Sequence, residues 1–271
     1  MTKKSASDSS PFQHRARKRF GQNFLNDPGI VSRIVRSIAP KPDDNIVEIG
    51  PGQGAITAPL LEACPKLQVI EIDNDLVPIL LAQFAKYNDF KIHQQDALKF
   101  DFSSLANDKP LRIVGNLPYN ISTPLIFHLL SFQQKISDMH FMLQKEVVER
   151  LAASAGEKHY GRLSIMTQYY CQVDHLFGVP PECFSPRPKV DSAIVRLAPF
   201  NTLPFVANDK EHFSHLVNIA FQQRRKTLRN TLKQILSKEQ IDLLPIDTSL
   251  RPEKLSVEDY VNLSNNILEL V

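Results

Sequence analysis

The regular alternation of short apolar segments with amphipathic ones restricts the fold of this chain more than any other feature. Strand-like segments are expected at 45–50, 67–73, 90–96, 111–117 and 138–144, and helix-like segments precede, separate and follow them. Strands that alternate with helices are typical of βαβ units and a parallel sheet, so we expect an α/β fold. Such sheets bind ligands at the carboxyl ends of their strands. The residues that follow each apolar segment are therefore the first candidates for a site.

The region after this alternation divides into two parts. The segments 171–180 and 192–199 flank a proline-rich loop, and they can extend the sheet as antiparallel strands. From about residue 201 the pattern turns helical, with long amphipathic stretches at 212–236 and 257–270. We therefore place a domain boundary near residue 200.

A glycine turn, EIGPGQGAIT, closes the first strand and opens the next helix. Gly50, Gly52 and Gly54 let the main chain approach a ligand without Cβ clashes. Amide groups at the start of the helix can also receive an anionic group. The spacing is G-x-G-x-G and differs from the G-x-G-x-x-G of dinucleotide sites. By itself, the turn fits either a nucleotide-like ligand or a tight structural turn.

Acidic residues end the next two strands. Glu71 lies about twenty residues after the glycines, a position suited to hydrogen bonds with ribose hydroxyls. Asp96 ends the third strand, where a carboxylate can accept from the exocyclic amine of an adenine. The three strand ends predict a pocket for an adenosine-containing cofactor. NAD and S-adenosylmethionine both fit at this point.

The fourth strand ends in Asn116-Leu117-Pro118-Tyr119, where the reactive end of the cofactor would lie. Adenine N6 is a poor nucleophile, because its lone pair is delocalised into the ring. The Asn116 amide oxygen and the Leu117 carbonyl can each accept a hydrogen bond from one N–H group of this amine. These hydrogen bonds would direct the nitrogen lone pair at a methyl group. Pro118 restrains this backbone, and Tyr119 offers a face for an extruded base. Such positioning catalysis favours S-adenosylmethionine and adenine methylation over a plain turn.

Cysteine usage and hydropathy indicate the compartment. Cys64, Cys171 and Cys183 form no C-x-x-C pair, which predicts neither a disulfide framework nor a metal site. We find no signal peptide and no apolar run of membrane-spanning length. We therefore expect a cytoplasmic protein with no membrane partner.

Basic residues gather in two places, although the formal net charge is only +3. Residues 1–19 lack apolar periodicity and read as a flexible basic arm, either a solvated tail or an RNA contact. The second cluster lies in the helix-like stretch FQQRRKTLRN, with no acid until Glu239. Such clusters are typical of proteins that bind a phosphate backbone. The candidate RNA-binding residues are Arg17, Lys18, Arg19, Arg224, Arg225, Lys226 and Arg229.

Motifs along nearly the whole chain resemble those of the ribosomal RNA adenine dimethyltransferases that modify the small subunit. They are RKRFGQNFL, EIGPGQGAIT, EID, QQDAL, GNLPYNIS, CFSPRPKVDSAIVRL and FQQRRKTLRN. The resemblance implies a Rossmann-like class I S-adenosylmethionine-dependent methyltransferase domain at 20–200. It also implies a small helical domain at 201–271 that docks on RNA or the ribosome.

The same resemblance implies a substrate. The enzyme would dimethylate N6 of two adjacent adenines in the 3′-terminal hairpin loop of small-subunit (16S) rRNA. It would act during subunit biogenesis, on an immature 30S-type subunit, and we expect it to be a monomer.

Individual residues follow from the resemblance as well. Asn23 and Leu25 would help to cover the cofactor. Other cofactor positions would be Gly50, Glu71, Ile72, Asp96, Ala97 and Asn116. Phe184 would stack on the target adenine opposite Tyr119, or else plug the loop against the core. Lys189 would contact phosphate or remain solvated.

Two other functions stay open. The first is a large-subunit rRNA or DNA adenine methylase. DNA enzymes commonly have Asp-Pro-Pro-Tyr where this chain has Asn-Leu-Pro-Tyr, and RRKTLRN resembles the small-subunit enzymes. The second is a ribosome-assembly factor that binds RNA without turnover. Intact Asn116, Tyr119, Glu71 and Asp96 argue against a site that has lost catalysis.

Overall fold

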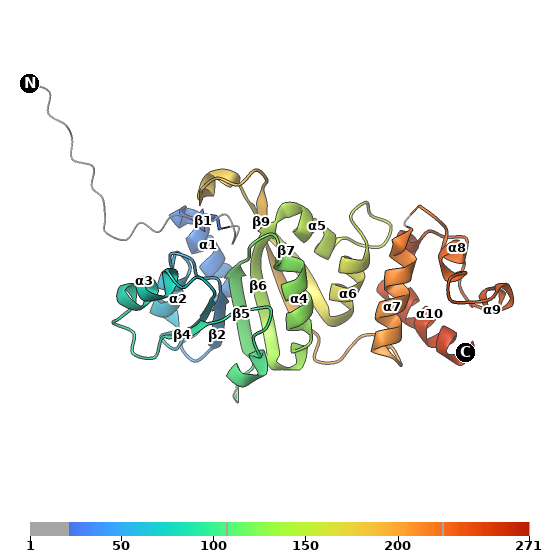
Figure 1. Cartoon of the computed structure of the whole chain (residues 1–271), viewed down its shortest axis with the longest axis horizontal. Coiled ribbons are helices and arrows are strands. Elements are labelled where there is room, and N and C mark those ends of the chain that lie inside the picture. The colour runs from blue at the N-terminus through green and yellow to red at the C-terminus, as the bar shows by residue number, and fades with distance from the viewer. Residues whose placement is uncertain (1–21, 107, 224, 271) are drawn as a thin grey trace, which may run out of the picture.

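A seven-stranded sheet forms the centre of the N-terminal part in this computed structural model, which describes residues 22–106, 108–223 and 225–270 (Figure 1). The strand order is β4-β3-β2-β5-β6-β9-β7. Strands β4 to β6 in this order are parallel, whereas β9 runs antiparallel to both of its neighbours. The strands are β2 (Asn45–Ile49), β3 (Gln68–Glu71), β4 (Lys91–Gln94), β5 (Leu111–Asn116), β6 (Ile136–Gln144), β7 (Cys171–Val179) and β9 (Ser192–Pro199). The expected α/β fold is confirmed.

Helices cover both faces of the sheet. The first six are α1 (Pro28–Ile38), α2 (Thr57–Ala63), α3 (Leu76–Gln83), α4 (Ser122–Leu130), α5 (Lys145–Ala152) and α6 (Arg162–Tyr170). Short 3-10 turns are η2 (Phe102–Leu105), η3 (Gln133–Lys135), η4 (Pro181–Cys183) and η5 (Pro252–Lys254). The helix-like segments of the sequence correspond to α1 to α5, whereas neither α6 nor the 3-10 turns were predicted. No helix in the described ranges is both long and apolar enough to cross a membrane.

Successive apolar residues of each central strand enter different cores, because side chains of a strand alternate between its two faces. Val47 and Ile113 pack in the core beneath α4 and α5. Their neighbours Ile46 and Val114 pack in the core beneath α1, α2 and α3. A strand buried on both faces is apolar throughout, and this explains the continuous apolar segments of the sequence.

A second, very small sheet lies beyond the main one. β1 (Phe24–Leu25) pairs antiparallel with β8 (Phe184–Ser185), and the main-chain amide of Asn26 donates to the Cys183 carbonyl at 2.9 Å. Directly after β1, Asp27 caps α1 by accepting from the Ile30 amide at 2.8 Å. The cap fixes where the chain leaves β1 and enters the helix.

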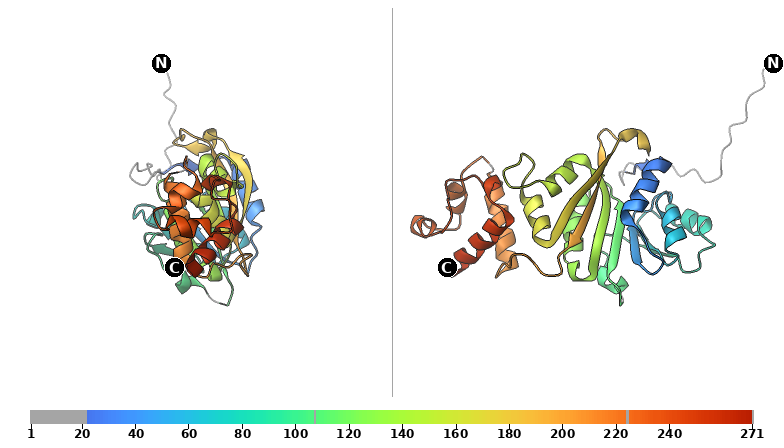
Figure 2. Two further views of the ribbon diagram at one scale, coloured as in Figure 1. Left: turned by 90° about the vertical axis from the view of Figure 1, so that its right-hand side faces the viewer. Right: turned by 180° about the vertical axis from the view of Figure 1, so that it is seen from behind.

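The C-terminal helices form a core of their own at one end of the molecule (Figures 1 and 2). They are α7 (Lys210–Gln222), α8 (Leu228–Leu232), α9 (Lys238–Asp242) and α10 (Val257–Leu270). Side chains of α6, among them Ile165 and Tyr169, pack in this same core. α6 therefore joins the C-terminal helices to the sheet domain.

The basic stretch FQQRRKTLRN differs from its predicted structure. We expected one continuous helix, but α7 ends at Gln222 and α8 begins at Leu228. The amide of Leu228 donates to the Leu250 carbonyl at 2.7 Å, outside the helical pattern. Contacts with the later chain thus redirect the main chain between the two helices.

Candidate active site

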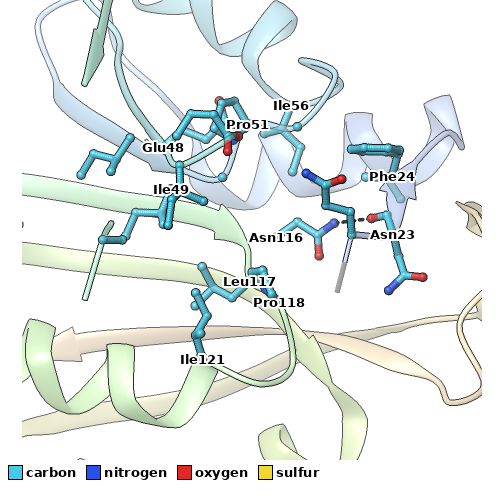
Figure 3. A pocket seen from close by; sticks show the side chains of 18 of the residues that line it. Asn23, Phe24, Glu48, Ile49, Pro51, Ile56, Asn116, Leu117, Pro118 and Ile121 are labelled. Carbon is cyan, nitrogen blue, oxygen red and sulfur yellow. Dashed lines mark hydrogen bonds between the residues drawn. The ribbon is translucent and has the colours of Figure 1, made fainter. Parts of the chain in front are cut away.

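A cavity of roughly 290 Å³ opens at the carboxyl ends of β2, β3, β4 and β5, where the sequence placed the site (Figure 3). The candidate residues that line it are Asn23, Leu25, Gly50, Gly52, Glu71, Ile72, Asp96, Ala97, Asn116, Leu117, Pro118, Tyr119 and Phe184. Residues that are far apart in the sequence, such as Asn23 and Phe184, therefore line the same cavity. The order of the strands reverses between β2 and β5, and the cavity lies at that point, which is the usual ligand position in such sheets.

Two glycines of the turn after β2 line the cavity in the left-handed region. Gly50 has φ +67° and Gly52 has φ +58°, a conformation that residues with a Cβ rarely adopt. A Cβ on Gly52 would also lie 3.1 Å from the Phe24 ring. The absence of a side chain therefore lets β1 close over the turn.

Gly54 of the same turn packs closely against α3. It has φ +84°, and it does not line the cavity. A Cβ there would lie 2.8 Å from Cζ of Phe84, which is buried at the end of α3. Packing of α3 against the turn accounts for this glycine.

The acids at the ends of β3 and β4 face the same cavity. Glu71 is buried and accepts from the Asp73 amide at 2.8 Å, and burial raises its pKa. The neighbouring Ile72 is 45% exposed and presents an apolar surface beside this carboxylate. Asp96 accepts from the Leu98 amide at 3.0 Å. Carboxylates beside an apolar surface fit the ribose, amine and ring of an adenosine.

Glu48 is a cavity residue that the sequence reading missed. It lies inside β2, almost fully buried, and its carboxylate accepts from the Thr57 hydroxyl at 2.7 Å. Burial raises the pKa of Glu48 to about 7. A charged residue within the otherwise apolar segment NIVEIG was the available signal.

The amide of Asn116 has a fixed orientation at the end of β5. Its Nδ2 donates to the main-chain carbonyl of Asn23 at 3.0 Å (Figure 3). Gly115 lets β5 approach β2 at this point, since a Cβ there would lie 2.6 Å from the Ile49 carbonyl oxygen. One N–H of Nδ2 is engaged by Asn23, just before β1, so the amide oxygen of Asn116 can accept a hydrogen bond from a ligand in the cavity.

Two aromatic residues line the cavity beyond Asn116. Tyr119 is half-buried, and its hydroxyl lies 3.2 Å from Oγ of Ser192. Phe184 lies in β8 opposite Leu25 of β1 and is only 5% exposed. Phe184 therefore belongs both to the core and to the wall of the cavity.

The segment before α1 covers one side of the cavity. Gln22 donates from Nε2 to the Asp73 carboxylate at 3.0 Å, and the following residues contact Asn116 and β8 as described. Gln22, Asn23, Phe24 and Leu25 all line the cavity.

In the described ranges, no three His, Cys, Asp or Glu side chains gather as a metal site.

Comparison with known proteins identifies the family. The family model described as ribosomal RNA adenine dimethylase matches residues 13–269. The chain belongs to the ribosomal RNA adenine dimethylase family. A ribosomal RNA small subunit methyltransferase A from Saccharophagus degradans is 68% identical over 96% of this chain and 98% of its own length. The protein of the same name from Marinobacter nauticus is 60% identical over 93% of this chain and 91% of its own length.

Solved structures support the same family. A dimethyladenosine transferase from Plasmodium falciparum is 28% identical, with a TM-score of 0.75 over 91% of this chain and 96% of that one. The 23S rRNA methyltransferase ErmE, at 22% identity, has a TM-score of 0.72 over 90% of this chain and 99% of its own. The second likeness concerns the fold alone. The Rossmann-like methyltransferase fold that the family motifs implied is confirmed.

The candidate RNA-binding residues that the structure describes are not among those that line the cavity. Lys189 is exposed on the segment between β8 and β9, and Arg225 and Lys226 are exposed between α7 and α8. Arg229 instead forms an ion pair with Asp242 at 2.6 Å, so part of its charge is used within the chain. Arg17, Lys18, Arg19 and Arg224 lie outside the described residues.

The segment His159-Tyr160-Gly161 leads into α6 and contacts both parts of the molecule. Tyr160 is buried in the core of the C-terminal helices, and Gly161 is the N-cap residue of α6. The His159 ring lies 3.8 Å from the Glu149 carboxylate on α5. The segment thus fastens α6 to both parts of the molecule.

Proposed function

We propose that this chain transfers methyl groups from S-adenosylmethionine to N6 of two adjacent adenines in the 3′-terminal hairpin loop of small-subunit (16S) rRNA. The observation that carries this proposal is the orientation of Asn116, whose Nδ2 is held by Asn23. An oxygen acceptor is thereby presented at the end of β5. Family membership and the names of the relatives support rRNA as the substrate.

The chemistry of the site follows from hydrogen bonding. The Asn116 oxygen and the Leu117 carbonyl accept hydrogen bonds from the two N–H groups of the target amine. These hydrogen bonds reduce the delocalisation of the nitrogen lone pair into the ring. The lone pair then points at the methyl donor. Pro118 and the buried Leu117 side chain hold this loop in place, so that the rate gain comes from positioning.

The residues of the cavity fit an adenosine-containing cofactor. Glu71 would bind the ribose hydroxyls, Asp96 the adenine amine, and Ile72 one face of the ring. Asn23 and Leu25 would cover the cofactor from the side of β1. When bound, S-adenosylmethionine supplies a methyl group on a positively charged sulfur.

Tyr119 and Phe184 would bind the target base. An enzyme that modifies a base edge must take the base out of its stack, and aromatic faces repay part of that cost, about 1–3 kcal/mol for each base. Both side chains line the cavity next to Asn116.

The full substrate is an immature 30S-type subunit. Lys189, Arg225 and Lys226 are exposed cations that would contact rRNA phosphates, and the C-terminal helices would supply a docking surface. We propose that a monomer acts in the cytoplasm, where small subunits are assembled.

Transfer of labelled methyl groups tests the function. Small subunits that lack the modification should accept label from S-adenosylmethionine at the two adjacent adenines. Mature subunits, large subunits and DNA serve as controls and should accept none. Label confined to large-subunit RNA or DNA would replace this function with a related methylase. No label in any substrate would leave a non-catalytic assembly factor.

A further inference from the structure

The hydroxyl group of Ser192 is buried next to the aromatic wall of the cavity. Ser192 is 1% exposed, begins β9, and does not itself line the cavity. Its Oγ lies 3.2 Å from the Tyr119 hydroxyl. The residues after it in β9, Ala193, Ile194 and Val195, are apolar and buried. Burial of a hydroxyl group without a hydrogen bond costs free energy. The hydrogen bond to Tyr119 therefore helps to stabilise a serine at this buried position.

The main chain around Ser192 is held on both sides. Ser192 pairs with Gln144 of β6 and with Val179 of β7. The Lys145 amide also donates to the carbonyl of the preceding Asp191 at 2.9 Å. Ser192 is therefore a fixed point from which a hydrogen bond can hold a less constrained side chain.

Tyr119 is the less constrained of the two residues. It lies in the loop between β5 and α4, and its carbonyl accepts from the Ser122 hydroxyl at 3.2 Å. That contact fixes the main-chain end of Tyr119 but leaves the ring free to turn about its side-chain bonds. The hydrogen bond to Ser192 fixes the opposite end.

We propose that Ser192 is a positioning residue for methyl transfer, because its hydroxyl holds the Tyr119 ring in the plane on which the target adenine stacks. This inference rests on the proposed function. It extends that function to a residue that touches neither cofactor nor base. Phe184 and Ser192 bound the same connecting segment, so one segment sets both aromatic walls of the base site.

Kinetics on unmodified small subunits test the proposal with two complementary variants. Ser192→Ala removes the anchor from the buried strand, and Tyr119→Phe removes the same hydrogen bond without changing β9. Each should lower kcat about tenfold, because small misplacements of reacting groups are costly. The KM for subunits should stay within about twofold, since phosphate contacts dominate RNA affinity. The double variant should lose no more than either single variant.

Two controls separate positioning from stability. Ser264→Ala removes another buried serine hydroxyl, which lies 2.8 Å from His212 in the C-terminal core, and should leave kcat unchanged. Ser192→Thr restores a hydroxyl and should regain most of the lost rate. The chain contains no tryptophan, so an RNA hairpin with 2-aminopurine at the target position reports stacking without interference from indole emission. Ser192→Ala and Tyr119→Phe should quench this base less than the wild-type protein at saturation.

The outcomes distinguish the two proposals. Wild-type rates in both variants, or losses that multiply in the double variant, would overturn the role of Ser192 while the function stands. Unchanged 2-aminopurine quenching would do the same. If the unaltered protein transfers no methyl group to small subunits, the function fails and the role of Ser192 fails with it.

Discussion

The side-chain nitrogen of Asn116 lies 3.0 Å from the main-chain carbonyl oxygen of Asn23 and donates to it. An amide suits this position because it offers a donor to the Asn23 carbonyl, just before β1, and an acceptor to the cavity. A carboxylate has acceptors only, and one of its oxygens would face the Asn23 carbonyl. The segment that covers the cavity thus requires asparagine in first place of the Asn-Leu-Pro-Tyr motif.

Asn116→Asp should therefore lower kcat by about a hundredfold, an effect comparable to the loss of other fixed hydrogen-bond groups in active sites. RNA affinity should change less than about twofold, because phosphate contacts supply most of it. Asn116→Ala should also abolish turnover. Single-turnover methyl transfer and filter binding give the two numbers, with the exposed Asn201→Asp as a control for charge. Full activity of the Asn116→Asp variant would remove the amide-orienting role.

Gly54→Ala should destabilise the fold rather than weaken cofactor binding directly. The positive φ and the contact with Phe84 together should lower the free energy of unfolding by about 2–4 kcal/mol. Adding Phe84→Leu should recover part of that loss. Gly178→Ala is the matched control, since a Cβ there meets nothing within 4 Å. Urea unfolding measures all four proteins, and equal stability of Gly54→Ala and Gly178→Ala would contradict the packing role.

Glu48→Gln should change how stability depends on pH. The folded-state pKa of Glu48 is raised by burial to about 7, so the folded protein holds this proton more tightly than the unfolded chain. The stabilisation is complete below about pH 4.5 and is lost as pH rises through 7, up to about 3 kcal/mol. The side-chain amide of the variant keeps a partner for Thr57 without this dependence. If the free energy of unfolding changes equally between pH 5 and pH 8 in the wild-type protein and in Glu48→Gln, the raised pKa of the buried carboxylate would be contradicted.

His140→Leu should remove a loss of stability that the wild-type protein shows at low pH. His140 is buried on β6, and this burial lowers its pKa to about 4. The charged groups nearby are Asp138, Arg112 and Arg196. Stability should be complete above pH 6.5 and fall as pH drops through the lowered pKa, by about 2 kcal/mol at pH 5. The leucine variant should lack this loss, whereas the exposed His175→Leu should retain it.

Replacing Arg225 and Lys226 with glutamine should weaken RNA binding about equally for all RNA sequences. If both contact phosphate, the slope of log affinity against log salt should fall by about 1 to 2. The matched control removes two exposed lysines, Lys41 and Lys135, before the amino ends of β2 and β6. That control should keep the wild-type slope. Equal slopes in both variants would place the loop between α7 and α8 outside the interface.

Much of the site was predictable because strand ends in a parallel sheet converge. Glu71, Asp96 and Asn116 each follow a recognisable apolar segment, and they meet in one cavity. Glu48 was missed because it lies within a strand, where its carboxylate is buried against Thr57. The contact of Gly54 with Phe84, thirty residues away in the sequence, also could not be read from the glycine motif.

Other features depend on contacts that no local pattern contains. β1 and β8 have two residues each, so neither shows the alternation of a strand. The break between α7 and α8 arises where Leu228 bonds to Leu250, within a stretch whose own periodicity is helical. Tertiary hydrogen bonds override local preference at both places.

The pairing of β1 with β8 also has a consequence for synthesis of the protein. β1 leaves the ribosome early, whereas β8 follows six strands of the sheet in chain order. A nascent chain can assemble the strands that carry Glu71, Asp96 and Asn116 before the partner of β1 exists. The cover of the cavity is completed only when the Phe184 segment emerges. A cofactor-binding enzyme therefore forms late in translation, after most of its sheet domain has been made.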